Sequence, residues 1–431
     1  MNASWSHMLL GDLIELKRGY DLPKKQRVAG HVPLISSAGL SDCHDEAKVK
    51  GPGVITGRYG TIGEVFYIKD DFWPLNTTLY VKDFKGNHPK FIYYFLKTIN
   101  YLQFSDKAAV PGVNRNHLHK ASILVPLNID EQKQIAKILS DLDDKIHLNN
   151  QINQTLESIA QALFKSWFVD FDPVRAKIAA KQEGKDSELA AMCIISGKSE
   201  DEIQQMPEGD FAELQATAAL FPEEFVESEL GEVPKGWEVS TVGEQVQAVG
   251  GGTPSTKNAD FWDNGIHYWT TPKDLSNLTD KILLNTERKL TDTGLKKISS
   301  GLLPKNTVLM SSRAPVGYLA LAKIEVAINQ GYIAILPNTK YSAEYLIQWC
   351  EANMAEIKGR ASGTTFLEIS KKNFREINFI CSDEKVVTVY TKTAKTLYDE
   401  ISLKAEENQS LINLRDTLLP KLLSGELEVL T

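Results

Sequence analysis

The sequence NQTLESIAQALF at Asn153–Phe164 recurs as NQSLINLRDTLL at Asn408–Leu419, 255 positions further along the chain. Its first four residues differ only by serine in place of threonine, and the apolar positions that follow coincide. Apolar residues spaced by three and four predict an amphipathic helix. One chain therefore carries the same helix twice, and this duplication determines the fold that we expect for the rest of the sequence.

The helical pattern extends beyond this stretch as a heptad repeat. Apolar and amide residues step by four and three from Ile135 to Leu163, and the same steps recur from Tyr390 to Leu418. This periodicity is typical of helices that pack along a seam in a coiled coil. The chain must return after the intervening sequence, so we expect an antiparallel pair. The predicted seam residues are Ile135, Leu139, Leu142, Ile146, Leu156, Leu163, Leu397, Ile401, Leu411 and Leu418.

Two packing arrangements are compatible with such a seam. Each helix can pack on its own domain, or the two helices can pair with each other. Two seams of equal length, with polar residues at the same places, favour pairing. The matched asparagines Asn153 and Asn408 would then fix the register of the pair. Lys404 and Arg415 interrupt the second seam, and they either pair with acids across the helices or face a partner.

The duplication covers most of the chain, because four further pairs of segments recur in the same order. The pairs are Trp5–Gly19 with Trp237–Gly251, Val54–Gly63 with Val308–Gly317, Pro74–Val81 with Ala327–Ile335, and Val113–Leu118 with Ile369–Phe374. Short β-type runs broken by Gly, Pro and Asn surround one helical segment in each copy, which predicts an α+β fold with mixed strands. We expect two similar domains at 1–128 and 237–381, spacer helices at 129–170 and 382–431, and an acidic central linker at 171–236.

The net charge of −8 does not exclude nucleic acid as a partner, because the acidity is local. Residues 174–236 hold 6 basic and 14 acidic side chains, and the remainder of the chain holds 42 of each. Basic faces on the two similar domains can therefore bind phosphates, which depends on the local charge rather than on the total.

Cysteine usage and hydropathy predict a cytoplasmic protein without a metal site. The four cysteines lie far apart and form no C-x-x-C pair, which is typical of reduced thiols and gives no zinc-binding pattern. No apolar run reaches the ~18 residues that a membrane span needs. The opening residues also show no secretion signal.

Two similar domains joined by paired helices suit a linear target in two parts, and double-stranded DNA is the target that we favour. Arginine can bond to guanine, and asparagine or glutamine to adenine, in the major groove, while lysine can hold phosphates. For each such residue the alternatives are a solvated side chain or an asparagine that shapes a turn. The candidate DNA-binding residues are Lys24, Lys25, Arg58, Asn76, Asn114, Arg115, Lys257, Lys273, Arg313, Asn329, Gln330 and Lys371, with Arg58 aligned to Arg313 and Asn76 to Asn329.

The sequence holds no catalytic motif that we can identify. It has no G-x-x-x-x-G-K-[ST] phosphate loop, no H-E-x-x-H and no G-x-S-x-G. The glycine-rich run Gly250–Lys257 lacks the preceding strand and following helix that would cradle a nucleotide. We therefore expect a non-catalytic chain. Two other classes stay open, namely a coiled-coil adaptor that does not bind DNA and, less favoured, a self-contained nuclease or methyltransferase.

The repeats, the paired helices, SWFVDFDPVRAK at Ser166–Lys177 and LFPEEFVESELGEVPKGWEV at Leu220–Val239 resemble the specificity subunit of type I restriction–modification systems. The resemblance covers essentially the whole chain. It implies two target-recognition domains for a bipartite, interrupted DNA site. It also implies helices that space the domains and dock two modification subunits, with restriction subunits added. S-adenosylmethionine, ATP and magnesium would then be bound by those partners and not by this chain.

Overall fold

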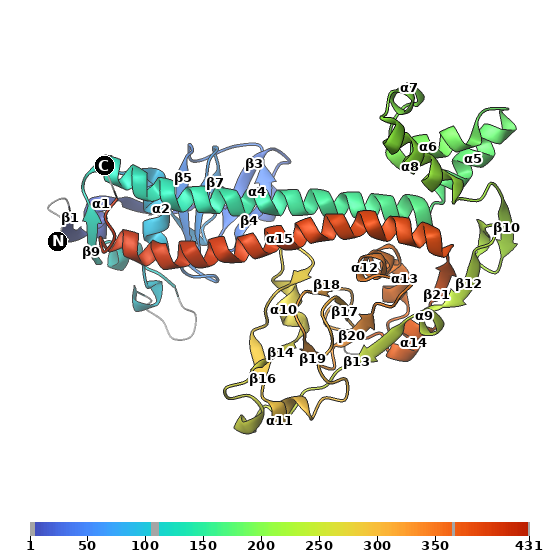
Figure 1. The fold of residues 1–431 in the computed structure, drawn as a ribbon. Coiled ribbons are helices and arrows are strands. Elements are labelled where there is room, and N and C mark those ends of the chain that lie inside the picture. Colours follow the sequence, from blue (N-terminus) through green and yellow to red (C-terminus); the bar gives the residue numbers. More distant parts are fainter. Residues whose placement is uncertain (1–4, 105–111, 364–366, 430–431) are drawn as a thin grey trace. The chain divides into compact units, whose positions relative to one another are not determined.

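The structure is a computed structural model that describes residues 5–104, 112–363 and 367–429. It divides into two compact units (Figure 1). The first unit holds residues 1–147 together with 409–431, and the second holds residues 148–408. Each unit has its own sheets and its own hydrophobic core.

The first unit is built on a four-stranded antiparallel sheet and a three-stranded mixed sheet. The larger sheet has the order β2-β8-β5-β6, and the smaller one has the order β4-β3-β7 with β3 and β7 parallel. A separate pair, β1 with β9, is antiparallel. The elements are β1 (Trp5–Leu9), α1 (Leu10–Leu13), β2 (Glu15–Arg18), η1 (Lys24–Gln26), β3 (Val32–Ser36), β4 (Gly39–His44), β5 (Gly53–Gly57), β6 (Val65–Ile68), β7 (Trp73–Pro74), β8 (Thr78–Asp83), α2 (Pro89–Lys97), η2 (Tyr101–Phe104), α3 (Arg115–Leu118) and β9 (Ser122–Pro126).

The second unit repeats this topology with one addition. Its sheets β13-β20-β17-β18 and β16-β14-β19 and its pair β12-β21 correspond to those of the first unit, and β15 adds a fifth strand in parallel with β18. The predicted internal repeat and mixed α/β fold are confirmed. The elements are β12 (Glu238–Thr241), α9 (Val242–Gln245), β13 (Gln247–Gly250), η3 (Ala259–Phe261), β14 (His267–Thr270), α10 (Pro272–Ser276), β15 (Ile282–Leu283), β16 (Arg288–Leu290), α11 (Asp292–Leu295), β17 (Thr307–Ser311), β18 (Leu319–Ala322), β19 (Ala327–Ile328), β20 (Tyr332–Leu336), α12 (Ala343–Ala352), α13 (Met354–Gly359), α14 (Lys371–Arg375) and β21 (Asn378–Cys381).

Two helices of 40 residues each, α4 (Ile129–Phe168) and α15 (Glu384–Leu423), pack against each other inside both units. In the first unit Ile135 and Leu139 of α4 belong to the same buried cluster as Leu422 of α15. In the second unit Ala160 belongs to the same cluster as residues of the first turns of α15, so the pair runs antiparallel as predicted. In the part of the chain that the structure describes, no helix is both long and apolar enough to cross a membrane.

Asparagines form a polar layer in the seam of the second unit. Asn149 is fully buried, and its amide nitrogen donates to the side-chain oxygen of Asn408 over 2.9 Å. Asn408 in turn donates to Asn150 over 2.8 Å. The layer pairs Asn408 with Asn149 and Asn150, whereas Asn153 donates to the main-chain oxygen of Ile401 over 3.3 Å. A buried amide that finds its partner in one alignment only fixes the register of the two helices.

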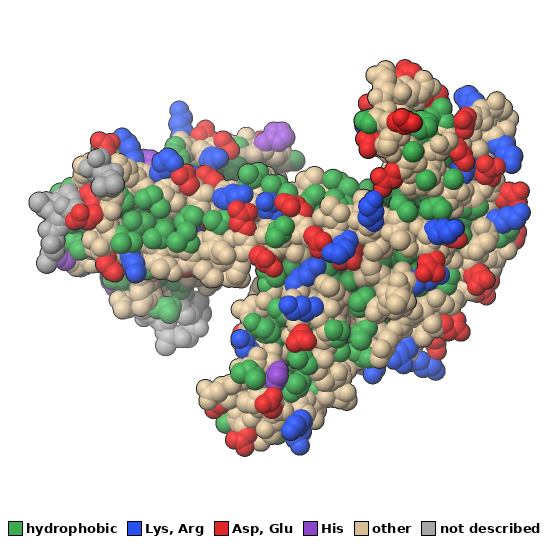
Figure 2. Space-filling model, in the orientation of Figure 1, with side chains coloured by type: hydrophobic (Ala, Val, Ile, Leu, Met, Phe, Trp, Pro, Cys, Tyr) green, Lys and Arg blue, Asp and Glu red, His purple; other side chains and the backbone are tan. Residues whose placement is uncertain are grey.

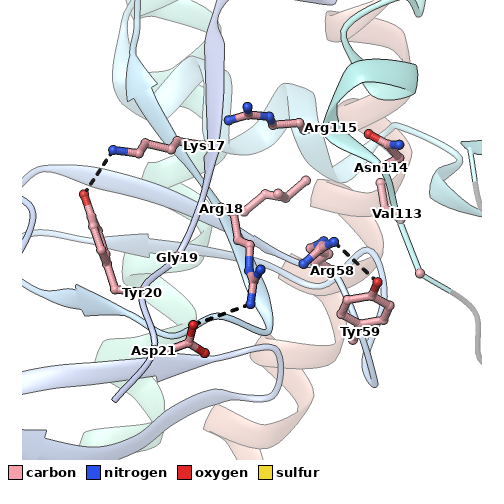
Figure 3. A pocket seen from close by; sticks show the side chains of 12 residues that line it. Lys17, Arg18, Gly19, Tyr20, Asp21, Arg58, Tyr59, Val113, Asn114 and Arg115 are labelled. Carbon is pink, nitrogen blue, oxygen red and sulfur yellow. Dashed lines mark hydrogen bonds and ion pairs between the residues drawn. The ribbon is translucent and has the colours of Figure 1, made fainter.

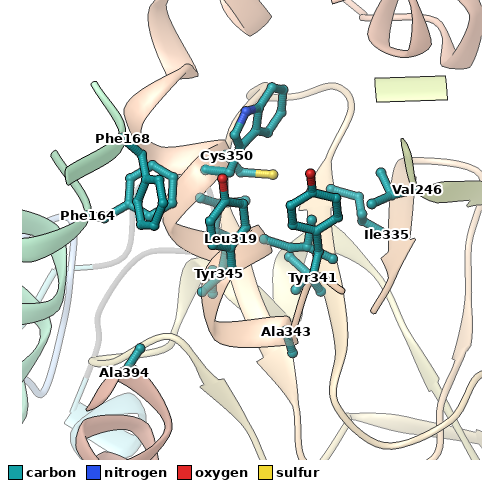
Figure 4. Close-up of a cluster of buried hydrophobic side chains, with 14 of the residues drawn as sticks. Phe164, Phe168, Val246, Leu319, Ile335, Tyr341, Ala343, Tyr345, Cys350 and Ala394 are labelled. Carbon is teal, nitrogen blue, oxygen red and sulfur yellow. The ribbon is translucent and has the colours of Figure 1, made fainter. Parts of the chain in front are cut away.

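Aromatic residues fill the core where α4 ends in the second unit (Figure 4). Phe164 and Phe168 of α4 meet Tyr345 of α12 edge to face, with ring centroids 5.1 and 5.0 Å apart. Tyr390 of α15 lies 5.2 Å from Phe168 in the same arrangement. Such edge-to-face contacts add to the burial of the rings. In the repeated helix the corresponding residues are Leu419 and Leu423, so this aromatic packing belongs to the second unit.

The acidic segment predicted as a linker is folded. It forms the helices α5 (Asp172–Gln182), α6 (Ser187–Ser196), α7 (Glu200–Gln204) and α8 (Glu208–Ala219) and the hairpin β10 (Phe225–Ser228) with β11 (Gly231–Pro234). Figure 2 shows acidic side chains over α5 to α8. Residues of the SWFVDFDPVRAK sequence anchor the start of α5. Phe171 and Val174 are buried in the core of the second unit. The buried Lys177 donates a hydrogen bond to the main-chain oxygen of Phe221 over 2.8 Å.

Candidate nucleic-acid interface

A basic cavity of about 650 Å³ opens in the first unit, between the end of β2, the loop after β5 and the start of α3 (Figure 3). It brings together three of the predicted residues, Arg58, Asn114 and Arg115. It also contains Lys17 and Arg18, which the sequence analysis did not select. The complete lining is Lys17, Arg18, Gly19, Tyr20, Asp21, Arg58, Tyr59, Leu79, Gly112, Val113, Asn114 and Arg115.

Arg58 is held in place from both sides of its main chain. Its N–H donates to the carbonyl oxygen of Thr77 over 2.9 Å, and its own carbonyl oxygen accepts from the N–H of Val113 over 3.0 Å. The guanidinium lies 4.5 Å from the ring centre of Tyr59, which supports it by a cation–π contact. Among the described residues, no carboxylate lies within ion-pair distance of Arg58. One guanidinium nitrogen donates to the hydroxyl of Tyr59 over 3.4 Å, which positions the side chain and leaves its other donors for a ligand.

Arg115 is the first residue of α3, and Lys371 is the first residue of the corresponding helix α14. Asn114 and Ser370 cap these helices, accepting from Asn116 over 3.0 Å and from Asn373 over 3.1 Å. The oxygen of Asn114 is thus used within the protein. The two basic residues occupy equivalent positions in the two units, as the sequence alignment of these segments predicts.

A second equivalence fixes α3 and α14 against the strands beside them. The imidazole of His119 accepts from the N–H of Leu16 over 2.9 Å, and in the second unit Arg375 donates to the carbonyl oxygen of Ala248 over 2.5 Å. Burial lowers the pKa of His119, with the nearby Arg115 and Lys85 acting in the same direction, so the ring stays neutral and able to accept.

The loops after β5 and β17 are equivalent, but the residues in them correspond one position away from the pairing of Arg58 with Arg313 that the sequence suggested. The main chain of Ser312 donates to Gly331 over 2.8 Å and accepts from Ile369 over 3.0 Å, which are the contacts that Arg58 makes in the first unit. Arg58 is therefore equivalent to Ser312, and Arg313 is equivalent to Tyr59. The alignment of Arg58 with Arg313 was wrong because it matched the residue type and ignored the spacing from the preceding strand.

The same one-residue difference applies to the amide residues. The N–H of Leu75 donates to Ile35 over 2.8 Å, and the N–H of Asn329 makes the corresponding bond to Thr270 over 3.1 Å. Asn76 therefore corresponds to Gln330 and not to Asn329, and the aligned pair was wrong here too.

The three amide side chains have partners within the protein. Asn329 accepts from the N–H of Gly331 over 2.8 Å and so shapes its turn. Asn76 donates to Asp21, and Gln330 accepts from Thr253 over 2.5 Å.

The remaining predicted cations lie on the surface and outside the cavity. Lys24 and Lys25 belong to the exposed 3₁₀ turn η1, and Lys257 lies in the exposed loop before η3. Lys273 pairs with Glu287 over 2.8 Å, and this bond raises its pKa. Arg313 lies 3.6 Å from Glu368. Lys273 and Arg313 are thus paired with acids, whereas none of the described acids lies within ion-pair distance of Arg58.

The glycine-rich loop Gly250–Lys257 of the second unit is held by two tryptophans. The indole of Trp262 donates to Ser255 over 3.0 Å, and the indole of Trp269 donates to Gly252 over 3.2 Å. Arg288 stacks on Trp262 with its guanidinium carbon 3.5 Å from the ring centre. These contacts fix the shape of the loop. Over the described residues, no group of three or more His, Cys, Asp or Glu is placed to hold a metal ion.

Comparison with known proteins identifies the family. Residues 2–158 and 234–411 match the model described as type I restriction modification DNA specificity domain. The chain is 34% identical over 359 residues to the type I restriction enzyme HindI specificity subunit of Haemophilus influenzae, covering 79% of this chain and 77% of that one. It is 37% identical over 156 residues to the MjaIX specificity subunit of Methanocaldococcus jannaschii, covering 36% of each.

A solved structure shows the same fold. The crystal structure of the type I restriction–modification S subunit from M. genitalium matches with a TM-score of 0.56 and 16% identity, covering 98% of this chain and 96% of that one. The duplicated family match and the extent of similarity to the Haemophilus subunit agree with the duplicated fold. The chain therefore belongs to the type I restriction–modification specificity subunits, the non-catalytic components that recognise the DNA target.

Proposed function

We propose that residues 1–128 and 237–381 are two target-recognition domains, each of which recognises one half of an interrupted DNA site. The supporting observation is that equivalent main-chain positions carry different side chains. Arg58 corresponds to Ser312, and Tyr59 corresponds to Arg313, on loops with the same hydrogen bonds. The same scaffold with different donors recognises different bases.

The first domain contacts DNA through its basic cavity. Arg58 is the candidate for a base contact, because its backbone is fixed and its guanidinium is not paired with an acid among the described residues. Lys17, Arg18 and Arg115 surround it and are suited to phosphates. In the second domain Lys371 takes the place of Arg115. Lys24, Lys25, Lys257, Lys273, Arg313 and Gln330 stay candidates at the edges of these surfaces.

The long helices dock two copies of one partner, the modification subunit. Two pairs of exposed apolar residues, each 255 positions apart, support this proposal. Leu148 and Leu403 are 50% and 59% exposed, and Ile159 and Leu414 are 48% and 47% exposed. Within each helix the two members lie eleven residues apart, which is close to three turns and places them on one face. Repeated apolar faces suit repeated copies of a partner.

The partners supply the chemistry in the cytoplasm. Modification subunits bind S-adenosylmethionine and methylate adenine, and restriction subunits bind ATP and magnesium. The test is sequencing of methylated adenines in cells that express this chain with its modification subunit. Methylation at two short sequences separated by a fixed gap supports the proposal. Methylation at one continuous sequence contradicts it.

A further inference from the structure

The two units differ at one edge of their large sheets. In the second unit β18 is covered by β15, where Leu321 and Lys323 donate their N–H groups to the carbonyl oxygens of Lys281 and Leu283 over 2.7 and 3.0 Å. In the first unit the equivalent strand β6 is the last strand of its sheet. Register shows that Tyr67 is equivalent to Leu321, since each pairs with a valine at the same place in the preceding strand. Among its described residues, the first unit therefore has no counterpart of β15.

The residues of β18 are more deeply buried than those of β6, as expected if only β18 is covered by a further strand. All four residues of β18 are buried, whereas Phe66, Tyr67 and Ile68 of β6 are only half-buried. The neighbouring helix shows the same difference, because Ile347 is fully buried and its equivalent Tyr93 is not. An uncovered strand edge is a template for pairing with another chain.

A cleft of about 420 Å³ runs along this edge. On one side it is lined by Ile35 and by Leu40, which is 66% exposed. On the other side it is lined by α2 and α4, including Tyr93 and Asp144. One side of an added strand would therefore meet the apolar Ile35 and Leu40, and the other would meet tyrosine rings beside polar side chains. In the second unit Ile282 and Leu283 fill the two corresponding sides and are buried.

We propose that β6 binds an extended peptide of another protein chain as an added parallel strand. The second unit shows the form of this peptide, which has two consecutive apolar residues like Ile282 and Leu283. The residue before these two apolar residues should carry the opposite charge to that of Lys281. Lys281 lies 2.9 Å from Glu157 and 2.8 Å from Glu351, whereas the position equivalent to Glu351 in the first unit is Lys97. The peptide therefore carries an acidic residue where the second unit has Lys281.

Charges at the cleft agree with this assignment. Asp143 already binds Tyr94 over 2.7 Å and Arg415 over 2.7 Å, and Asp144 lies 3.7 Å from Lys90. Lys97 is exposed, and its ammonium nitrogen lies 4.6 Å from the ring centre of Tyr93. Because Lys97 occupies the position equivalent to Glu351, we assign its ammonium group as the partner of the carboxylate on the peptide, and Lys69 and Lys90 line the cleft itself. Main-chain bonds give such strand addition its affinity, and side-chain pockets give it specificity.

The test uses the full chain and a synthetic peptide, Thr-Asp-Glu-Ile-Leu-Leu-Asn, which is the sequence of residues 279–285 with glutamate in place of Lys281. Amide hydrogen exchange is followed with increasing peptide. The amides of Tyr67 and Lys69 should become saturably protected by at least tenfold. Those of Leu321 and Lys323 should be protected at all concentrations, as an internal control. The peptide that keeps lysine should bind at least fivefold more weakly.

Charge reversal in the protein provides the decisive variant. Lys97→Glu should invert the preference between the two peptides, and Lys50→Glu, an exposed change outside the cleft, should leave it unchanged. Absence of peptide protection at Tyr67 and Lys69 overturns the proposal. So does protection of the same amides by random-sequence duplex DNA, or by self-association at higher concentration of the chain alone.

Discussion

Arg58 illustrates what fixes a recognition side chain in this fold. Its main chain bonds to Thr77, just before β8, and to Val113, just before α3, and its side chain rests on Tyr59. Bidentate contacts from a guanidinium to guanine contribute about 1–3 kcal/mol of discrimination. Because Ser312 occupies the equivalent position with a much shorter side chain, the two domains should depend on different residues.

We predict that Arg58→Ala relaxes one half of the DNA target by about 1–3 kcal/mol and leaves the other half unchanged. The measurement is binding to duplexes that vary one half-sequence at a time, with the modification subunit present. Ser312→Ala is the matched control and should not affect the half that Arg58 recognises. An equal loss in both halves would show that Arg58 contributes through the fold or through general charge.

A different outcome is expected for Arg115→Ala and Lys371→Ala. Both residues start capped helices at equivalent positions, and we propose that they contact phosphates, which carry no sequence information. Each change should weaken binding to all sequences alike and reduce the slope of log affinity against log salt by about one. Lys297→Ala, an exposed change elsewhere on the second unit, is the control. A loss confined to one base pair would instead assign base contacts to these residues.

The polar cluster beside β15 allows a prediction about stability. Burial raises the pKa of Asp280 above that of an exposed carboxyl, with Glu157 adding to the effect. A carboxyl with a raised folded-state pKa favours folding only as pH falls through that pKa, so its charge opposes folding at neutral pH. Asn153 also holds a buried oxygen that lacks a hydrogen-bond partner among the described residues, next to Asp280.

Asp280→Asn should therefore raise the free energy of unfolding by about 1 kcal/mol at neutral pH, the size of one hydrogen bond. The new amide removes the buried charge and can donate to the oxygen of Asn153. The gain should shrink as pH falls toward 4, where the native aspartate becomes protonated. Urea unfolding at a series of pH values measures it, with the exposed Asp263→Asn as control. A gain independent of pH would rule out the charge as its cause.

At the residue scale, the sequence alignment matched the corresponding loops of the two units but not the register within them. Arg58, Asn114 and Arg115 were selected from two separate segments, and the structure brings them into one cavity. Lys17 and Arg18 were missed, although the run LKRG at 16–19 stood in the aligned segment. The error at Arg313 has a physical origin. Neighbouring residues in an extended chain face opposite sides, so one position changes the direction of the side chain.

At the scale of elements, each domain contacts the helix pair through a polar cluster built at the same place with different residues. In the first unit Tyr94 and Arg415 both bind Asp143. In the second unit Gln348 donates to Tyr398 over 2.8 Å, and Tyr398 donates to Glu157 over 3.2 Å. Tyr398 lies 255 positions after Asp143, which makes the clusters equivalent. Different partners at one place prevent either domain from packing on the wrong helix segment, because buried polar groups would lose their bonds.

Exchanging apolar for charged residues on the outer faces of the helices tests the docking proposal. Leu148→Asp and Leu403→Asp should each remove one modification subunit, and the double variant should remove both, as measured by native mass spectrometry. Burying a charge in an apolar contact opposes binding, and folding is unaffected because both positions are exposed. Glu406→Lys on a polar part of α15 is the control. Retention of both subunits in the double variant would place the docking surface elsewhere.

Periodicity identified the helices with much greater accuracy than it identified the strands. The heptad steps predicted a seam from Ile135 to Leu163, and α4 spans Ile129–Phe168. By contrast, β15 consists of only two residues and depends on β18, which is distant in sequence. Short strands of this kind carry no periodic signal. Lys404 and Arg415 also show that polar residues in a seam have separate uses, since Arg415 pairs with Asp143 and Lys404 with Glu400 and Glu407 on its own helix.

At the scale of the whole molecule, the two copies share one fold. We propose that the differences between them determine which DNA sequences are recognised. The copies share the order of their main strands, and they share the periodicity of the long helix, which the sequence repeat predicted. They differ in β15, in the loops that carry Arg58 and Ser312, and in the inserted helices α5 to α8. We propose that recognition of two different half-sequences, and peptide binding at β6, depend on these differences, which a comparison of matching letters does not reveal.

The last prediction concerns the two long helices, each of which contributes residues to both units. We propose that their length sets the gap between the two recognised half-sequences. Seven residues inserted after Ile152, with seven more after Lys404 in the facing layer, keep the heptad phase of both helices. The insertion lengthens each helix by ~10 Å, at ~1.5 Å per residue. This corresponds to about 3 base pairs of DNA at ~3.4 Å each.

Methylated-adenine sequencing of the insertion variant should show the same two half-sequences with a gap longer by about 3 base pairs, for the geometric reason just given. Two controls separate length from disturbance. Seven residues inserted after Gly184, in the turn between α5 and α6, should leave the gap unchanged. Four residues inserted in each helix break the heptad phase and should reduce binding at every gap. An unchanged gap in the seven-residue variant would show that helix length does not set the spacing, and altered half-sequences would show that the two domains do not recognise DNA independently.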